Sequence, residues 1–334
     1  MTKLPTIVMD KKPNERSQLG WLWRIGLVSA TLAWLAFLTV GCGAGNPRVP
    51  HGGKSWTNSL GMVFVPVKGT KVLFCIWATR VSDFSAFVEE TRYDTGDSLS
   101  TIRSREREKP GDAAGSWRNP GFPQTPDHPV VGVNSGDAGA FCHWLTKREQ
   151  QAGTLRSRQQ YRLPTQEEMK QACSCEILHP PDSSDPGWSA DPFPSPKDLA
   201  QFRNLFPWGS IWPPPKGAGN LLDRSFKSKY GKLSRGEVRN EIPDYQDGYA
   251  ETSPVGSFNP NVYGLYDLAG NVMSWIGDKS ATGRNVQGTS VMPYTTSGSA
   301  WDTGDSMDLI SGRKGGWSDG RYDDIGFRCV IVVH

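Results

Sequence analysis

Alternating hydrophobic and polar positions near both ends of the folded region predict short β-strands. Apolar residues alternate over 62–67 and recur over 72–76, and the turn-forming residues 68–70 lie between these two segments. This arrangement is typical of a hairpin. The last apolar run, over 326–333, is rich in valine and predicts a terminal strand.

Three segments carry apolar residues at the spacing of an α-helix. One begins at Ser82, and a second covers 134–150 with Asp137 near its start. A third begins at Thr165, where Glu168 follows three residues later and completes a capping-box pattern. We therefore expect three helices in the first half of the chain.

Long polar stretches separate these elements. The ranges 92–127, 176–201 and 279–311 lack hydrophobic periodicity and are rich in glycine, proline or small polar residues, as surface loops are. The chain contains 37 glycines, 25 prolines and 13 tryptophans, which suits a loop-rich fold whose core is filled by a few large aromatic residues. Periodicity alone predicts a loop-rich α+β domain.

The N-terminal segment has the layout of a secretory signal. Basic residues precede an apolar run over 25–40, and Gly41 and Cys42 follow it. This ending resembles a bacterial lipobox, in which Cys42 would be acylated after cleavage. Two alternatives stay open: an uncleaved membrane helix over 21–40, which is long enough to span a bilayer, and an ordinary cleaved signal. All three place the rest of the chain outside the cytoplasm.

The predicted organisation is a signal peptide, lipobox or membrane anchor over 1–42, a short linker over 43–57 and a domain over 58–334. The expected location is the bacterial cell envelope, with the domain lipid-anchored or membrane-tethered and facing the periplasm or the exterior. The formal net charge of +3 implies no polyanionic partner, and no nucleic-acid-binding motif is present. The P-loop and HExxH patterns are also missing from the sequence.

Eight segments follow the order of the motifs in the formylglycine-generating enzyme (sulfatase-modifying factor) family, which this chain resembles. Two of them read GLYDLAGNVMSW (264–275) and GGWSDGRYDDIGFRC (315–329). Six more lie upstream, at 58–66, 77–91, 128–144, 161–172, 206–209 and 252–258. The resemblance implies the family's C-type-lectin-like fold, an α+β architecture with many loops and few helices.

The resemblance also implies a structural calcium site made of hard oxygen ligands. Its ligands would be the Asn220 side chain, the Leu221 carbonyl, the Asp247 carboxylate and the Tyr249 carbonyl. The alternative is that Asn220 and Asp247 only stabilise turns, as these residue types often do.

A second calcium site of the family maps onto Asp267 and the carbonyls of Gly270 and Val272. Ser274 stands where the family has a glutamate ligand, and this exchange removes a full negative charge. The second site is therefore expected to be weak or empty. Asn271 would then make structural hydrogen bonds within its turn.

The cysteines are interpreted through the same resemblance and through the oxidising compartment. The family's pattern pairs Cys142 with Cys329 in a disulfide, which would join the terminal strand to the first half of the domain. Cys173 and Cys175 are expected to be unpaired or partly buried thiols, with a CxC metal site as the alternative. Cys75 lies on a predicted strand.

A missing pair of cysteines decides the expected function. Oxidase members of the family bind copper through two cysteines between their last two motifs, whereas residues 317–326 contain none. Because monovalent copper needs soft thiolate ligands, copper is not expected. The leading hypothesis is a non-catalytic, envelope-anchored domain that binds a peptide, protein or glycan. The alternative is an active or divergent sulfatase-modifying (formylglycine-generating) oxidoreductase with an unrecognised site.

The expected contact surface surrounds the place where the family holds its copper. It consists of four aromatic residues and one arginine: Tyr294, Trp301, Trp317, Arg321 and Tyr322. Aromatic side chains with a polar group are common at binding surfaces because one end is apolar and the other can form hydrogen bonds. The expected partners are thus a peptide, protein or glycan ligand and, through the N-terminal anchor, the membrane.

Overall fold

The computed structural model describes a discontinuous set of residues: 49, 54–96, 99–100, 115–173, 206–230, 241–277, 283–284, 290–291, 295–304, 313–315 and 320–333. The elements below all belong to the unit formed by Asn46–His334. The predicted signal or anchor over 1–42 lies outside the described residues. Within the described residues, no helix is both long enough and apolar enough to cross a membrane.

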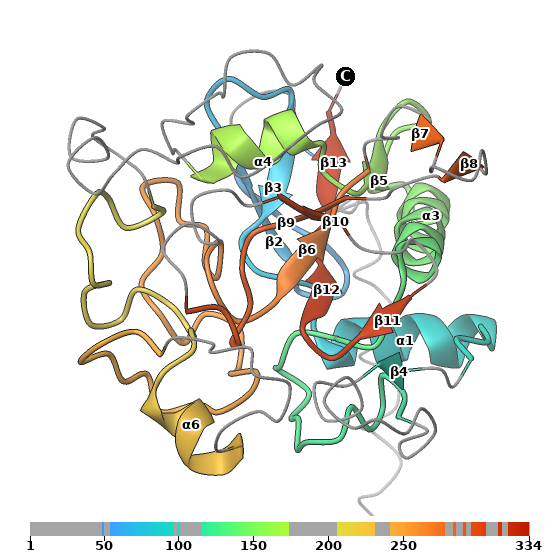
Figure 1. Ribbon diagram of the computed structural model, residues 1–334. Coiled ribbons are helices and arrows are strands. Elements are labelled where there is room, and N and C mark those ends of the chain that lie inside the picture. Colours follow the sequence, from blue (N-terminus) through green and yellow to red (C-terminus); the bar gives the residue numbers. More distant parts are fainter. Residues whose placement is uncertain are drawn as a thin grey trace, which may run out of the picture. The chain divides into compact units, whose positions relative to one another are not determined.

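A five-stranded sheet joins the first strands of the unit to the last one. Its strands, in spatial order, are β1 (Trp56–Thr57), β2 (Val63–Pro66), β3 (Val72–Cys75), β13 (Val330–Val332) and β5 (Gln160–Arg162), and each pairs antiparallel with its neighbour. The predicted hairpin and the predicted terminal strand are confirmed. Figure 1 shows β13 between β3 and β5, so the C-terminal strand is an interior strand of this sheet.

The strands of a second sheet come after β5 and before β13 in the sequence. It contains β10 (Arg313–Gly315), β9 (Thr295–Ser297), β6 (Met273–Trp275) and β12 (Ile325–Phe327), with β12 parallel to β6. Two smaller ladders pair β4 (Leu99–Ser100) with β11 (Arg321–Tyr322) and β7 (Gly283–Arg284) with β8 (Ser290–Val291). The short strands separated by loops agree with the predicted α+β pattern.

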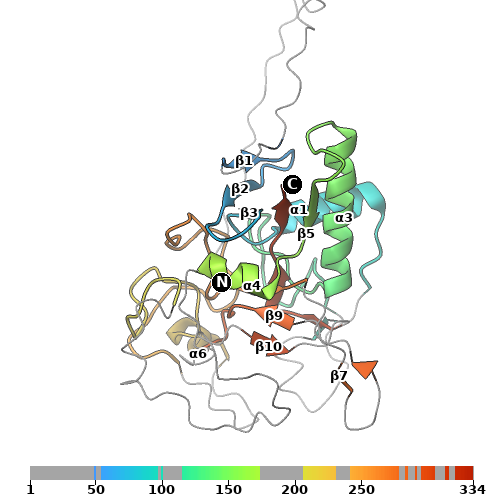
Figure 2. The same ribbon diagram turned by 90° about the horizontal axis from the view of Figure 1, so that it is seen from above.

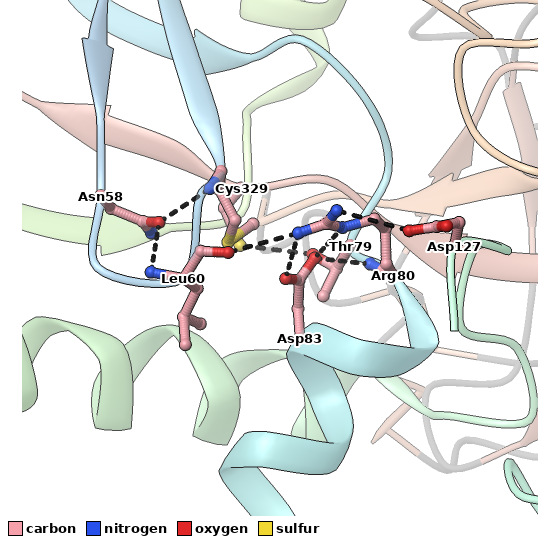
Figure 3. A network of polar contacts seen from close by, with 8 residues as sticks. Asn58, Leu60, Thr79, Arg80, Asp83, Asp127 and Cys329 are labelled. Carbon is pink, nitrogen blue, oxygen red and sulfur yellow. Dashed lines mark hydrogen bonds and ion pairs between the residues drawn. The ribbon is translucent and has the colours of Figure 1, made fainter.

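The described residues form four helices: α1 (Val81–Thr91), α3 (Ser135–Gln151), α4 (Gln166–Cys173) and α6 (Arg224–Tyr230). The predicted capping box of α4 is present, because Thr165 Oγ1 accepts a hydrogen bond from the Glu168 N–H at 3.1 Å and Glu168 Oε2 accepts one from the Thr165 N–H at 2.9 Å. Before α1, the guanidinium of Arg80 lies between Asp83 and Asp127, 2.9 Å and 3.6 Å away (Figure 3).

Aromatic side chains connect the helices to the second sheet. Phe84 of α1, Phe141 of α3 and Phe327 of β12 form a triangle with ring centroids 5.4–6.2 Å apart. All three rings are fully buried, so each contributes a large apolar area to the core. Figure 2 shows α3 lying beside β5, with which it makes its most extensive packing contacts.

Part of the predicted linker contributes to the fold. Val49 is fully buried, and its N–H donates a hydrogen bond to the Thr154 carbonyl at 3.1 Å. Trp56 is also buried and pairs opposite Phe64 as part of β1. The Gly- and Pro-rich composition of this segment concealed these two apolar anchors, which dock because the sheet and Leu155 offer them an apolar surface.

Candidate functional site

The Asp247 carboxylate joins two of the loop segments that carry the predicted calcium ligands. Asp247 Oδ2 accepts a hydrogen bond from the Leu221 N–H at 2.8 Å, and Asp247 Oδ1 accepts one from the Tyr249 N–H at 2.8 Å. Because Asn220 precedes Leu221 in the chain, the structure brings all four predicted residues of the first site into one neighbourhood.

The side chain of Asn220 is fully buried, and its amide is held in one orientation. Its Nδ2 atom donates to the Glu251 carbonyl at 2.7 Å, whereas its Oδ1 atom has no hydrogen-bond partner among the described residues. A buried oxygen without a partner is costly and rare. Amide oxygens of this kind are ligands for Ca²⁺, so the geometry fits a cation site better than a turn alone.

A further carboxylate, Asp223, lies beside Asp247. Asp223 is fully buried, and its Oδ2 atom accepts a hydrogen bond from the Asp247 N–H at 2.7 Å. Burial raises the pKa of Asp247 to about 7 against the opposing effect of the two N–H donors, and the charge of Asp223 adds to the increase. Sequence reasoning missed Asp223, although a carboxylate three residues after Asn220 was a signal that could have found it.

Two glycines allow the loop around Asn220 to approach a second loop closely. A Cβ atom at Gly219 would lie 2.4 Å from the Ala269 carbonyl oxygen, and one at Gly270 would lie 2.3 Å from the Asn220 carbonyl oxygen. The Asn271 N–H donates to the same Asn220 carbonyl at 2.7 Å. Any larger side chain would push the loops apart.

A cation bound here would be held by three kinds of oxygen: carboxylate, main-chain carbonyl and side-chain amide. Among the described residues, no group of three or more His, Cys, Asp or Glu side chains is arranged to hold a metal ion. Main-chain carbonyls and the Asn220 amide would therefore complete the ligand set alongside carboxylate. Such a set suits a hard cation such as Ca²⁺ and does not suit Cu(I).

The second predicted calcium set contains two buried oxygens without hydrogen-bond partners among the described residues, Asp267 Oδ1 and Ser274 Oγ. Asp267 Oδ2 accepts a hydrogen bond from the Gly256 N–H at 2.9 Å, and burial raises the pKa of Asp267. The other predicted ligands, the carbonyls of Gly270 and Val272, belong to buried residues. Because Ser274 stands where the family has a glutamate, Asp267 is the one charged residue among these predicted ligands. A weak or empty site therefore stays the prediction.

The structure brings the predicted disulfide partners together as free thiols. The Sγ atoms of Cys142 and Cys329 lie 3.5 Å apart, and both residues are buried. Thr79 Oγ1 lies 3.7 Å from Cys329 Sγ, as Figure 3 shows. Burial, followed by the proximity of Cys142, raises the pKa of the Cys329 thiol. Formation of the disulfide stays a prediction.

The other cysteines differ in their surroundings. Cys75 on β3 is buried, and burial raises the pKa of its thiol to about 12. Cys173 at the end of α4 is half-buried. Cys42 and Cys175 lie outside the described residues, so the predicted lipidation site and the CxC alternative stay predictions.

The expectation that Trp301 forms part of a contact surface is wrong. Trp301 is fully buried, and its Nε1 atom donates a hydrogen bond to the Asp323 carbonyl at 3.2 Å. Its ring packs against Phe122, Phe226 and Tyr230, with centroids 5.7–6.1 Å apart. The residue is a core side chain because two rings of α6 and the ring of Phe122 enclose it.

Two other members of the predicted surface lie on β11. Arg321 donates from Nε and Nη2 to the Asp137 carboxylate at 3.1 Å each, and 14% of its side chain is exposed. Tyr322 is half-buried. Tyr294 and Trp317 lie outside the described residues. Arg321 is thus held against the start of α3, and Arg321 and Tyr322 both offer partly exposed surface.

Comparison with known proteins identifies the family to which this chain belongs. The model of the Sulfatase-modifying factor enzyme 1-like domain matches residues 49–333. The chain is 28% identical over 168 residues to the formylglycine-generating enzyme of Bos taurus, covering 49% of this chain and 32% of that protein. It is 28% identical over 225 residues to the inactive C-alpha-formylglycine-generating enzyme 2 of Bos taurus, covering 64% and 55%. The matches span from about a third to just over half of these relatives' length.

The solved structure of PvdO from Pseudomonas aeruginosa has a TM-score of 0.51 at 18% sequence identity, and the match covers 85% of this chain and 99% of that chain. At this identity the likeness concerns the fold alone. The predicted α+β, loop-rich fold of the formylglycine-generating-enzyme type is confirmed. Because the family model matches most of its length, this chain belongs to the family of the Sulfatase-modifying factor enzyme 1-like domain.

Proposed function

We propose that this chain is a divergent, non-catalytic member of its family, anchored in the bacterial envelope, that binds a peptide, protein or glycan. The observation that carries the proposal is the content of the segment between the last two motifs. Residues 317–326 contain no cysteine, so the thiolate pair that oxidase members use for copper is missing from this position.

Three of the other cysteines are poor substitutes for that pair. Cys75, Cys142 and Cys329 are all buried. Burial raises the pKa of Cys75 to about 12 and also raises that of Cys329, so these thiols stay protonated at neutral pH, whereas metal binding needs the thiolate. These residues do not fit a copper site, and we derive no oxidation step for this chain.

Calcium has a structural role in this proposal. Asn220, the Leu221 carbonyl, Asp247 and the Tyr249 carbonyl would hold the ion and join two loops that also contribute Leu221 and Tyr245 to one apolar cluster. The unpartnered Asn220 Oδ1 atom supports the assignment. A bound ion would supply positive charge beside the Asp223 and Asp247 carboxylates and stabilise the loops without taking part in chemistry.

The ligand would bind at the C-terminal end of the domain. Tyr322 and Arg321 form the described part of this surface, and Tyr294 and Trp317 remain members of it on the grounds of sequence. Among the relatives, one is named as a formylglycine-generating enzyme and another as its inactive counterpart. The family therefore includes both active and inactive proteins, and the lack of cysteine in residues 317–326 favours an inactive one.

A direct test uses the purified full chain, a cysteine-containing peptide from a sulfatase, a copper(I) salt and oxygen. We expect mass spectrometry to find no conversion of the peptide thiol to an aldehyde, while the enzyme of a relative converts it in a parallel reaction. Aldehyde formation at a comparable rate would establish the alternative, an active formylglycine-generating oxidoreductase, and refute the proposal.

The binding surface is tested with any ligand captured from the envelope fraction. We expect Tyr322→Ala to weaken its affinity at least about fivefold, since loss of a central interface aromatic often costs more than about 1 kcal/mol. Val262→Ala is the control, because Val262 is 84% exposed and is not part of the proposed surface. Equal affinity of Tyr322→Ala and wild type would remove this surface from the proposal.

A further inference from the structure

Asp223 connects the candidate calcium loop to the beginning of α6. Its Oδ1 atom accepts hydrogen bonds from the Ser225 N–H at 2.7 Å and the Phe226 N–H at 3.3 Å, at the start of the helix. Its Oδ2 atom accepts one from the Asp247 N–H at 2.7 Å. One buried carboxylate therefore holds two segments whose sequence positions differ by more than 20 residues.

Two carboxylates, Asp223 and Asp247, lie together at this position. Among the described residues, no Lys, Arg or His forms an ion pair with Asp223 or Asp247. The nearest basic residues of α6 are engaged elsewhere: Arg224 faces Asp244 at 3.8 Å and Lys227 faces Glu241 at 3.0 Å. Adjacent, partly desolvated negative charges repel each other unless a proton or a cation lies between them.

A second observation points to a cation. Asn220 is fully buried, and its Oδ1 atom has no hydrogen-bond partner among the described residues. Asn220 precedes Leu221, whose N–H is bonded to Asp247. Within the described part of the chain, a carboxylate pair without a basic partner and an amide oxygen without a donor thus occur in the same two loops, and both would gain from a hard cation.

We propose that Asp223 is a positioning residue for calcium in this chain, holding the main chain of Asp247 in place and adding a second negative charge to the site. This inference rests on the proposed calcium site. Asp223 does not need to touch the ion, because both of its oxygens already accept hydrogen bonds from protein donors. Groups that orient ligands in this way tune metal affinity strongly.

A merely structural role for Asp223 has a different signature. If Asp223 served only to begin α6, its replacement would destabilise the metal-free protein and leave calcium affinity unchanged. If it also positions Asp247 and supplies charge to the site, its replacement weakens the binding of calcium, and the loss of stability is larger with calcium present than without it. The two roles therefore differ in whether the affinity for calcium changes.

The experiment measures calcium binding to the full chain by titration calorimetry, and melting temperatures with calcium or with a chelator. For Asp223→Asn we expect the calcium Kd to increase at least about tenfold, as for other residues that orient metal ligands. The melting temperature of Asp223→Asn should fall more with calcium present than in chelator, where only the lost hydrogen-bond acceptor contributes. Asp223→Glu, which keeps the charge, should bind calcium more tightly than Asp223→Asn.

Asp244→Asn is the matched control. Asp244 lies three residues before Asp247, and its side chain is 95% exposed, so this variant removes a nearby charge that water screens. We expect its calcium Kd to stay within about twofold of wild type, because exposed charges contribute little. A weakening equal to that of Asp223→Asn would show a general charge effect and overturn the specific role of Asp223.

The remaining outcomes separate the two proposals. If the wild-type chain does not bind calcium, the proposed calcium site fails and this inference fails with it. If wild type binds calcium and Asp223→Asn binds it equally well, the calcium site stands and the role of Asp223 is refuted. If Asp223→Asn and Asp223→Glu both fail to fold in chelator, Asp223 has a structural role and the inference is overturned.

Discussion

Single residues control how closely the loops of the candidate calcium site can approach each other. Gly270 has a φ of +85°, and it faces the Asn220 carbonyl across a gap with no room for a methyl group. Gly264 has a similar φ of +77°, but nothing lies within 4 Å of the place where its Cβ would be. A comparison of substitutions at these two glycines therefore distinguishes the cost of backbone strain from the cost of a steric clash.

We expect Gly270→Ala to lower the free energy of unfolding by more than Gly264→Ala does. Each substitution places alanine in the left-handed region, at a cost of about 1–2 kcal/mol. Only Gly270→Ala adds a steric clash, for which a further loss of about 1–3 kcal/mol is typical. Urea unfolding followed by tryptophan fluorescence measures both values. Equal losses would contradict the close approach of the two loops.

A buried histidine makes the domain sensitive to pH. His128 Nδ1 lies 2.9 Å from Thr252 Oγ1. Burial lowers the pKa of His128 in the folded protein, and the charge of Asp127 opposes this effect. Because the unfolded chain keeps the ordinary value of about 6.5, the contribution of His128 is fully present above that pH. It is lost as the pH falls below about 6.5 towards the folded pKa.

We expect the free energy of unfolding of wild type to fall more steeply than that of His128→Gln when the pH is lowered from about 7 to about 5, because only wild type carries this linkage. Chemical denaturation at a series of pH values measures the slopes. His143→Gln is the control at an exposed histidine and should keep the wild-type slope. Parallel slopes for wild type and His128→Gln would refute the role of His128.

At the scale of elements, the cysteine pair lies where a cross-link would matter most. Cys142 belongs to α3, and Cys329 lies between β12 and β13, 187 residues later in the chain. The two thiols thus face each other across the contact between the helical side of the core and both sheets. A disulfide here would restrict a very long loop in the unfolded chain, which the chain-entropy model values at about 5 kcal/mol.

We expect a reducing agent to lower the melting temperature of the wild-type protein purified from an oxidising compartment and to leave that of Cys142→Ser unchanged. Peptide mapping without reduction should recover the Cys142 and Cys329 peptides as one cross-linked species. Cys173→Ser, at the end of α4, should respond to reduction as wild type does. Recovery of both peptides as free thiols would show that the pair stays reduced.

At the scale of the whole molecule, the folded unit begins soon after the predicted lipidation site. Val49 is anchored to Thr154, and only residues 43–48 separate it from Cys42. If Cys42 carries the lipid, the domain is held close to the membrane surface, because so short a segment spans at most about 3.6 Å per residue. The domain would then bind its proposed ligand near the membrane.

We expect Cys42→Ser to abolish incorporation of labelled fatty acid and to leave the precursor uncleaved, because lipobox processing depends on that cysteine. Metabolic labelling and intact mass spectrometry of the expressed full chain measure both effects. The variant Cys173→Ser should be labelled like wild type. A wild-type chain with its full-length mass and no label would favour the uncleaved membrane helix, whereas cleavage without label would favour an ordinary signal.

The amino-acid sequence by itself determined the features that depend on near neighbours in the chain. The hairpin of β2 and β3, the helices α1 and α3 and the capping box at Thr165 were all predictable, because periodicity and capping are local. The order of the family motifs likewise predicted the fold that the family match confirms. The buried Val49 and Trp56 were missed because a polar, glycine-rich segment gives no periodic signal.

Only the tertiary structure decided which distant residues meet. It placed β13 between β3 and β5, enclosed Trp301 among three aromatic rings and brought Asp223 against Asp247. It also brought the Cys142 and Cys329 thiols within 3.5 Å. Each of these results depends on the packing of segments far apart in the chain. Burial and charge proximity arise from that packing, and they leave no trace in the local pattern of hydrophobic and polar residues.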